Sequence, residues 1–522
     1  MTDRGALLVA AGIFASRIFG LVRQHFLARY LGLSGVADAF NAAFRIPNVL
    51  QNLFGEGVLS ASFIPVYSRL IARGDREEAT RVAGAVASLL AMTVSVLVLL
   101  GVLATPWLID IIVPGFEGEK RALTIRLVRI LFPGAGLLAL SAWCLGVLNS
   151  HRRFLLSYAA PVVWNIAIIA VLVALGGSRE QEPLAVAAAW ASVAGSALQL
   201  VVQLPLVLRL LGTLQTGFAT ASANVRTVVR NFVPVFIGRG VVQISAYVDT
   251  VLGSLLPTGA VAAITSAQAL YTLPVSLFGM SVSAAELPAM SSAVGEEREI
   301  GAYLRERLDT GLRRIAFLVI PSAVAFLAIG DVLAAAVFQA GEFTRDDSRY
   351  VWAVLAGSAV GLLASTLGRL YASTFYALHD TRTPLRFALL RVGLALVLGY
   401  LLAVQLPPRV GLGGRWGAAG ITLAAGLAAW VECSLLRRRL GERIGATGLP
   451  TSYSVALWGA AFAAGAAGWG TKLLVGPAHP IVVAAATVPI YGATYFGVAA
   501  ALGIPESRRA FARAGGFVRR RR

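Results

Sequence analysis

Two arginines, Arg17 and Arg23, lie inside an otherwise apolar stretch near the N-terminus, GALLVAAGIFASRIFGLVRQHFLARYLG, which is long enough to cross a membrane as a helix. Arg17 falls roughly 18 Å along that helix, near the middle of a bilayer. A charge there costs about 2.5–3.5 kcal/mol on insertion scales, so both side chains should face protein or a water-filled cavity. The two arginines are about 9 Å apart along the helix and about 120° apart around it, so they can share one broad wall.

Polar residues gather in four of the predicted membrane spans, whereas the other spans are nearly pure Ala, Val, Leu and Gly. Ionisable groups inside a membrane mark functional sites by default, so the first two helices of each half should line a substrate cavity. The alternative is that some of them form buried ion pairs between helices, such as Arg45 with Glu56. The residues that we predict to bind substrate are Arg17, Arg23, Asp38, Arg45, Asn48, Gln51, Glu56, Arg239, Gln243 and Gln268.

The predicted cavity is mixed in sign but cationic at its core. The planar guanidinium of arginine binds phosphate through two parallel hydrogen bonds, so a pyrophosphate headgroup with an apolar tail suits such a cavity. Asp249 is a candidate ligand for a coupling cation such as Na⁺, or for H⁺, and the alternative is a salt bridge to a neighbouring helix. We expect no other cofactor, because no phosphate-binding loop or GxGxxG context is present.

Composition defines the broad class of protein. The 522 residues are 57% hydrophobic and 14% charged, with a mean hydropathy of +0.75, whereas soluble domains carry about 25% charged residues. The connections between apolar segments are short and leave no room for a separate catalytic domain. Hydropathy predicts fourteen transmembrane helices, over residues 5–31, 36–66, 83–113, 123–149, 154–176, 184–208, 230–256, 260–290, 312–338, 350–377, 385–405, 416–436, 452–474 and 480–503.

Basic residues are concentrated in alternate loops, which the positive-inside rule places in the cytoplasm together with both termini. We therefore expect a multi-pass protein of the bacterial cytoplasmic membrane. The net charge of +19 does not indicate nucleic-acid binding, because the basic residues are spread over many short loops. The tail ESRRAFARAGGFVRRRR is expected to lie against anionic lipid headgroups or to act as an ordinary anchor. Cys144 and Cys433 fall in predicted spans and should be small packing residues.

The chain contains a weak internal repeat. Residues 36–66 carry Phe54-Gly55 followed by a proline and a serine, and residues 260–290 carry Phe278-Gly279 in the same pattern. The turn in GVLNSHRRFLLSYAAPVVWNI likewise matches the turn in STFYALHDTRTPLRFALLRV. The predicted fold is therefore all-α and polytopic, with two like-oriented six-helix halves around a central cavity and two extra C-terminal helices. The predicted domains are residues 1–220, 221–445 and 446–505, with a basic tail over 506–522.

The segments SRIFGLVRQHFLARYLG, DAFNAAFRIPN and FGEGVLSASFIPVYS resemble the N-terminal signature of the MurJ/MviN lipid II flippases. This family belongs to the multidrug/oligosaccharidyl-lipid/polysaccharide exporter superfamily, and FYALHDTRTP and QISAYVDT resemble its C-half motifs. The resemblance implies movement of an undecaprenyl-pyrophosphate-linked peptidoglycan precursor from the inner to the outer leaflet. It also implies alternating access powered by membrane potential or an ion gradient.

The resemblance carries over to particular positions. Those that match the family's motifs are Arg17, Arg23, Asp38, Asn48 and Glu56. The family commonly has an acid where Gln24 stands, and arginines where Gln51 and Ala269 stand. Arg239 is not a usual family position, and we expect it to replace part of the missing charge.

Three other functions compete with a flippase. One is a cation-coupled exporter of drugs or of another polyprenyl-linked oligosaccharide, although such exporters need not carry the Arg17/Arg23 set. A membrane enzyme such as a polyprenyl-phosphate transferase would need histidines or carboxylates gathered near one membrane face, and the four histidines are scattered. A scaffold would not explain a polar cavity. We therefore expect a transporter and not an enzyme, acting as a monomer.

Overall fold

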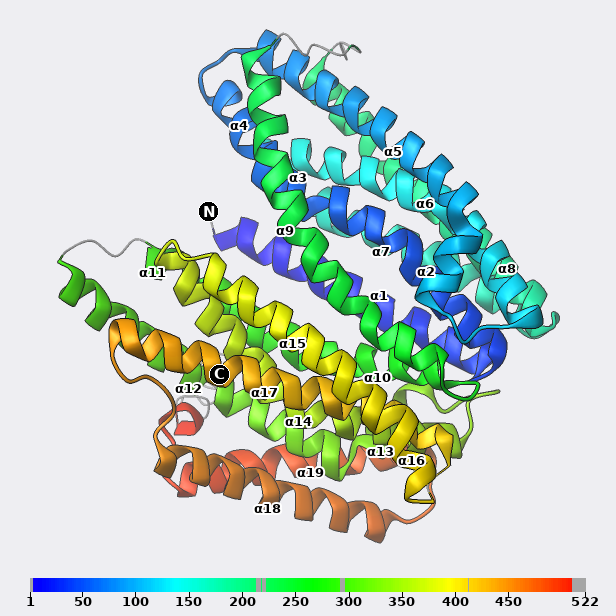
Figure 1. The fold of residues 1–522 in the computed structure, drawn as a ribbon, viewed down its shortest axis with the longest axis vertical. Coiled ribbons are helices and arrows are strands. Elements are labelled where there is room, and N and C mark those ends of the chain that lie inside the picture. The colour runs from blue at the N-terminus through cyan, green and yellow to red at the C-terminus, as the bar shows by residue number, and fades with distance from the viewer. Residues whose placement is uncertain (1–2, 213–216, 218–221, 292–295, 412, 509–522) are drawn as a thin grey trace, which may run out of the picture. The chain divides into compact units, whose positions relative to one another are not determined.

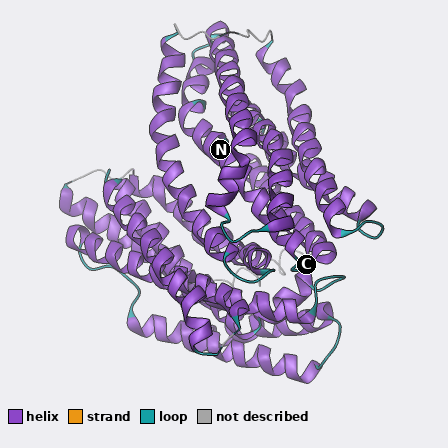
Figure 2. Cartoon of the chain, turned by 45° about the vertical axis from the view of Figure 1, so that its right-hand side comes forward, coloured by secondary structure: helices purple, strands orange, loops and turns teal. Residues whose placement is uncertain are grey.

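The computed structural model describes residues 3–212, 217, 222–291, 296–411 and 413–508, and over these residues the chain is helical with no strand (Figure 2). Each of the fourteen segments that hydropathy marks as a span contains a helix or a broken series of helices, so the all-α prediction is confirmed. Ten helical segments of the described chain are long and apolar enough to cross a membrane. The number of fourteen spans stays a prediction. Cys144 and Cys433 are free and buried, as expected of packing residues.

The contacts divide the chain into two compact units. The N-terminal unit is Met1–Ala262 with Ala340–Glu342, and the C-terminal unit is Ala263–Gln339 with Phe343–Arg522. The helices of the N-terminal unit are α1 (Asp3–Leu31), α2 (Gly35–Phe54), α3 (Glu56–Ser62), α4 (Ile64–Ala72), α5 (Arg76–Ile112), α6 (Gly118–Ser150), α7 (Phe154–Leu175), α8 (Gln181–Leu211) and α9 (Ala223–Ser254).

The C-terminal unit begins within α10 and contains the remaining helices (Figure 1). They are α10 (Ala260–Pro274), the π-helix η1 (Val275–Met280), α11 (Ser281–Ser291), α12 (Glu297–Ala328), α13 (Gly330–Phe338), α14 (Arg345–Ala377), α15 (Arg382–Tyr400), the π-helix η2 (Leu401–Gln405), α16 (Leu406–Arg409), the 3₁₀ turn η3 (Gly414–Trp416), α17 (Gly417–Ile444), α18 (Thr451–Val475) and α19 (Pro480–Ala501). The two helices without a counterpart in the repeat, α18 and α19, lie side by side in this unit (Figure 1).

Helix α9 packs within the N-terminal unit, although the sequence repeat assigns it to the second half after residue 220. Phe232 and Phe236 of α9 lie 5.6 and 5.3 Å from the ring of Phe54. The Tyr247 hydroxyl also donates a hydrogen bond of 3.0 Å to the backbone oxygen of Arg45. Contacts thus place the boundary between the two compact units within α10, and the predicted division at residue 220 stays a prediction.

The second span of each half is broken at its Phe-Gly pair. In the N-terminal unit α2 ends at Phe54 and α3 begins at Glu56, with Gly55 extended between them. A Cβ atom at Gly55 would lie 2.0 Å from the carbonyl oxygen of Gln51, so this backbone path requires glycine. In the C-terminal unit Gly279 lies in η1, where a Cβ atom would lie 2.8 Å from Cγ2 of Thr366.

The matched turns of the repeat share one backbone geometry. Arg152 (φ 58°) and His379 (φ 57°) are the described non-glycine residues with positive φ, and each lies in one of these turns. Hydrogen bonds of 2.9 Å run from the amide of Arg153 to the oxygen of Leu148, and from Asp380 to Phe375. Both turns thus close a helix with the same six-residue bond, which supports the repeat.

Candidate substrate-binding site

Arg23 of α1 holds its charge in an aromatic cage within the N-terminal unit. Its guanidinium carbon lies 5.3 Å from the ring centre of Phe44 on α2 and 4.8 Å from that of Trp164 on α7. Trp164 is itself oriented by its indole N–H, which donates to the backbone oxygen of Ser192 on α8 at 3.1 Å. Nε and Nη1 of Arg23 are buried and have no hydrogen-bond partner in the described part of the chain. The cage therefore desolvates a cation, two of whose nitrogens remain without a hydrogen-bond partner among the described residues.

Arg17 differs from Arg23 in its surroundings, although both belong to α1. Its side chain is exposed within the described structure, six residues before Arg23. Gln24, at the position where the family commonly has an acid, is buried. The predicted wall of two arginines is therefore one buried and one exposed cation.

Arg45 of α2 is tied to α9 in the same unit. Its Nη1 donates to Oγ1 of Thr250 at 2.7 Å, and Thr250 directly follows Asp249 in α9. Arg45 is therefore a candidate partner for the salt-bridge alternative at Asp249, which stays a prediction, whereas the side chain of Glu56 lies outside the described residues. The described residues contain no cluster of three or more His, Cys, Asp or Glu that could hold a metal ion. A coupling cation at Asp249 stays a prediction.

Asp38 is fully buried at the start of α2, where it joins three segments of the N-terminal unit. One oxygen accepts from Lys120 Nζ at 2.7 Å and from the Gly259 amide at 2.7 Å, and the other accepts from the Ala262 amide at 2.8 Å. The two amides belong to the first turn of α10 and its approach, where backbone N–H groups lack helical partners. These are the contacts of a structural residue, and a substrate contact by Asp38 stays a prediction.

Gln51 lines a polar pocket of about 650 Å³ inside the N-terminal unit, at the break between α2 and α3. The pocket also receives Asn52 and Ser60 from this broken span, Ser141 from α6 and Gln199 from α8. We did not predict Ser141 or Gln199 from the sequence. The available signal was the spacing of the hydroxyl and amide residues of α8, which are Ser192, Ser196, Gln199 and Gln203.

The remaining predicted residues are not brought into this pocket. Asn48 is half-buried on α2, and Gln268 is exposed on α10 of the C-terminal unit. The side chains of Glu56, Arg239 and Gln243 lie outside the described residues. Their roles as substrate contacts stay predictions.

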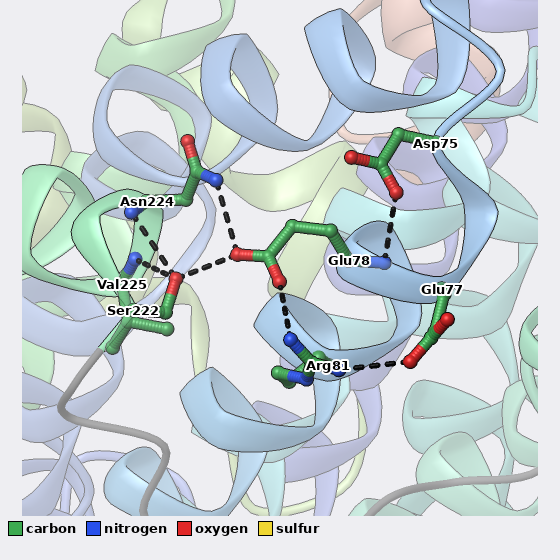
Figure 3. A network of polar contacts seen from close by, with 7 residues as sticks. All are labelled: Asp75, Glu77, Glu78, Arg81, Ser222, Asn224 and Val225. Atoms are coloured by element: carbon green, nitrogen blue, oxygen red, sulfur yellow. Dashed lines mark hydrogen bonds and ion pairs between the residues drawn. The ribbon is translucent and has the colours of Figure 1, made fainter.

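A separate polar network ties α5 to α9 outside the predicted spans (Figure 3). The Glu78 carboxylate accepts hydrogen bonds from the Ser222 hydroxyl at 2.6 Å, from the Asn224 amide at 3.0 Å and from Arg81 at 3.0 Å. Ser222 also caps α9 through the backbone amides of Asn224 and Val225. The bonds from Ser222 and Asn224 hold the pKa of Glu78 below its ordinary value. The network fixes the first turn of α9 to the N-terminal unit.

Apolar helices arranged around a caged arginine and a polar pocket define a membrane transporter, and the fold agrees with this class. A multidrug resistance MATE family transporter of the MOP superfamily, in an inward-facing conformation, matches with a TM-score of 0.64 and 19% identity, over 82% of this chain and 95% of that chain. A lipid II flippase MurJ in an inward closed conformation matches with a TM-score of 0.78 and 21% identity, over 94% and 98% of the two chains.

Sequence comparison then identifies the family. Residues 27–483 match the family described as lipid II flippase MurJ. The lipid II flippase MurJ of Burkholderia cenocepacia is 31% identical over 513 residues, which cover 95% of this chain and 96% of that protein. The chain therefore belongs to the MurJ family. The predicted resemblance is confirmed, and so is the prediction of a transporter instead of an enzyme, because the family is one of flippases.

Proposed function

We propose that this protein flips lipid II from the inner to the outer leaflet of the bacterial cytoplasmic membrane by alternating access, with both termini in the cytoplasm. Membership of the MurJ family supports the substrate. The alternation of basic loops along the sequence supports the orientation. Within this proposal the N-terminal unit supplies a contact to the pyrophosphate of the substrate through Arg23.

The observation that carries the proposal is the guanidinium of Arg23, whose Nε and Nη1 have no hydrogen-bond partner among the described residues. A buried donor without a partner costs about 1–3 kcal/mol, and more when it is charged. Phe44 and Trp164 hold the guanidinium plane, so little side-chain entropy remains to be lost when an anion binds. A pyrophosphate oxygen accepts charge-assisted hydrogen bonds from two guanidinium nitrogens at once. Binding of the substrate would thus remove the free-energy cost of burying these donors without a hydrogen-bond partner.

The test is complementation of a strain depleted of its own flippase. The unchanged protein should restore growth and the appearance of lipid II at the outer leaflet. Arg23→Ala should abolish both while membrane insertion remains normal, and Arg23→Lys should restore only part of the activity, because it keeps the charge and loses the planar fork. Arg209→Ala, an exposed arginine of α8, is the matched control. Wild-type growth with Arg23→Ala would contradict the proposal.

The rival proposal is a cation-coupled exporter of drugs or of another polyprenyl-linked oligosaccharide. The specific observation in its favour is the fold shared with a MATE transporter. Failure of the unchanged protein to replace a flippase, together with drug resistance on expression, would favour this rival.

The coupling ion belongs to the same proposal. Asp249→Asn should remove any Na⁺ or H⁺ dependence of transport if Asp249 binds the coupling cation. If Asp249 only pairs with Arg45, the ion dependence should stay unchanged, and Arg45→Gln should cause a similar loss of activity.

A further inference from the structure

Helix α8 carries a polar stripe through an otherwise apolar segment. Between residues 184 and 208 its hydroxyl and amide side chains are those of Ser192, Ser196, Gln199 and Gln203, spaced four, three and four residues apart. This spacing places them on one face of the helix. All four are buried, and Gln203 is only 1% exposed. Burial of neutral amides in an apolar setting costs free energy unless each polar atom has a partner.

Two side-chain oxygens of this stripe have no hydrogen-bond donor among the described residues. The side-chain amides of Gln199 and Gln203 both donate to the hydroxyl oxygen of Ser141 on α6, at 3.0 and 2.6 Å. The side-chain oxygens of both glutamines are buried and without a partner among the described residues. Ser141 has one hydroxyl proton, so it cannot satisfy two amide oxygens, whichever way round the amides lie.

A third acceptor lies on α7. Asn165 is 3% exposed, and its side-chain amide donates to the backbone oxygen of Pro161 at 3.0 Å. Its side-chain oxygen also has no partner within the described chain. Pro161 itself lines the pocket at the break between α2 and α3. Of these three residues Gln199 lines the pocket, whereas Gln203 and Asn165 are bonded to its lining residues Ser141 and Pro161.

The pocket has the size and chemistry of an uncharged ligand site. It has a volume of about 650 Å³, and the lining residues that the structure describes include no acidic or basic side chain. Divalent cations prefer carboxylate ligands, so neutral amide oxygens suit them poorly. The groups that complement spare neutral acceptors are hydroxyl and amide N–H donors.

The stripe also connects the pocket to the caged arginine. The same Ser192 that begins the stripe accepts the indole N–H of Trp164, whose ring covers Arg23. Ser192 and Gln199 are seven residues apart, about 10 Å along the helix axis. The residue that orients the cage of Arg23 and a residue that lines the pocket therefore lie about two turns apart on the same face of α8.

We propose that the pocket formed by α2, α3, α6 and α8 is a second subsite, which binds the hydroxyl or amide N–H groups of the saccharide–peptide headgroup of the substrate. This inference rests on the proposed flippase function. Arg23 would hold the pyrophosphate, and Gln199 with its neighbours would accept hydrogen bonds from the uncharged part of the headgroup. Leaving these acceptor oxygens unpaired costs free energy in the empty protein. Hydrogen bonds from the headgroup would remove that cost and so strengthen substrate binding.

The experiment compares three lipids bound to the full-length protein in lipid nanodiscs. They are undecaprenyl pyrophosphate, the same lipid bearing the disaccharide, and the lipid bearing the disaccharide and its peptide. Gln199→Leu should weaken binding of the headgroup-bearing lipids about tenfold, the loss of one to two hydrogen bonds, and leave binding of the bare pyrophosphate unchanged. The disaccharide lipid tells hydroxyl recognition from peptide recognition. Arg23→Ala should weaken all three.

The control is Gln181→Leu, the same change at the first residue of α8, which lies outside the pocket. Equal affinities of the unchanged protein for the three lipids would overturn the second subsite, and so would a Gln199→Leu variant that binds all three like the wild type. An equal loss for all three with a normal unfolding temperature would also overturn it, because the pocket would then act through Arg23. Failure of the unchanged protein to bind any of the lipids would instead contradict the proposed function.

Discussion

The two broken spans share the same Phe-Gly motif, but the buried polar groups near each break differ in charge and in their partners. In the N-terminal unit the break at Gly55 opens onto a pocket whose neighbouring amide oxygens lack partners in the described structure. In the C-terminal unit the π-helix at Gly279 packs on Thr366, and the buried carboxylate of Glu286 pairs with two arginines. One motif thus lies beside a pocket with unpartnered neutral oxygens in one unit and beside a buried ion-pair cluster in the other.

The difference indicates that the two halves of an internal repeat can have different roles, one in binding a ligand and the other in stability. Unpaired buried groups lower stability and are tolerated where a ligand completes them. The caged Arg23 and the spare oxygen of Gln199 both belong to the N-terminal unit. We therefore expect the broken span of the N-terminal unit to be sensitive in transport, and that of the C-terminal unit to be sensitive in stability.

The largest effect should come from adding a methyl group at the two breaks. Gly55→Ala places Cβ against the backbone oxygen of Gln51, which cannot move without rebuilding the break. We expect loss of transport and a destabilisation of about 1–3 kcal/mol. Gly279→Ala places Cβ 2.8 Å from the methyl carbon of Thr366 and 3.2 Å from its Cβ, so Thr366→Ser should remove the tightest contact and rescue the variant.

Unfolding temperature and lipid II flipping, both in nanodiscs, would check this pair. Rescue of Gly279→Ala by Thr366→Ser, with Gly55→Ala left inactive, is the expected pattern. A harmless Gly55→Ala would remove the basis for a rigid break at the pocket.

The second prediction compares a charge-paired group, Glu286, with a neutral group that has an unpartnered oxygen, Gln199. Glu286→Gln should lower the free energy of unfolding by about 1–2 kcal/mol, less than for a fully buried ion pair because Arg307 and Arg314 are partly exposed. Gln199→Leu should be neutral or slightly stabilising, since it removes a buried oxygen that has no partner. Denaturant unfolding of both variants measures the contrast. A larger loss for Gln199→Leu than for Glu286→Gln would reverse our assignment of the two units.

The third prediction concerns the cage around Arg23. Trp164→Phe keeps an aromatic face and loses the hydrogen bond to Ser192, so Arg23 should be held less firmly. We expect about three- to tenfold slower flipping, the equivalent of one hydrogen bond of about 1 kcal/mol. Trp190→Phe, at an exposed tryptophan of α8, is the matched control. Equal rates for both variants would show that the indole N–H does not position the site.

The smallest effect should appear at the network that holds α9 to the N-terminal unit. Because the pKa of Glu78 is lowered in the folded protein, its contribution is present above the ordinary glutamate pKa and is lost as the pH falls below about 4.3. We expect about 1 kcal/mol or less, since the site is partly exposed. The protection factors of the first turn of α9, which correct hydrogen exchange for its intrinsic pH dependence, should fall at acid pH in the wild type. In Glu78→Gln the exchange should already be fast at neutral pH, and a pH response that survives in this variant would contradict the assignment.

Much of this protein could be predicted from its sequence. The helices follow from apolar runs of membrane length, and the break at each Phe-Gly pair from glycine and proline within them. The functional importance of Arg23 could also be inferred from the sequence, since a charge inside an apolar span is costly wherever the helix packs. The polar stripe of α8 was visible in principle, because Ser192 through Gln203 repeat at helical spacing. We missed it because its residues are uncharged and cost less per residue in a hydropathy window than an arginine does.

Sequence alone determined the class, the family and the approximate path of the chain, because hydropathy and motif identity are properties of neighbouring residues. Only the tertiary structure decided which polar groups are satisfied. Asp38 and Arg23 were equally strong candidates in the sequence, yet the carboxylate of Asp38 finds Lys120 and two backbone amides, while two guanidinium nitrogens of Arg23 find only aromatic rings. That difference depends on residues up to 224 positions away in the chain. Hydrogen-bond partners of this kind are set by how helices pack, which no local pattern records.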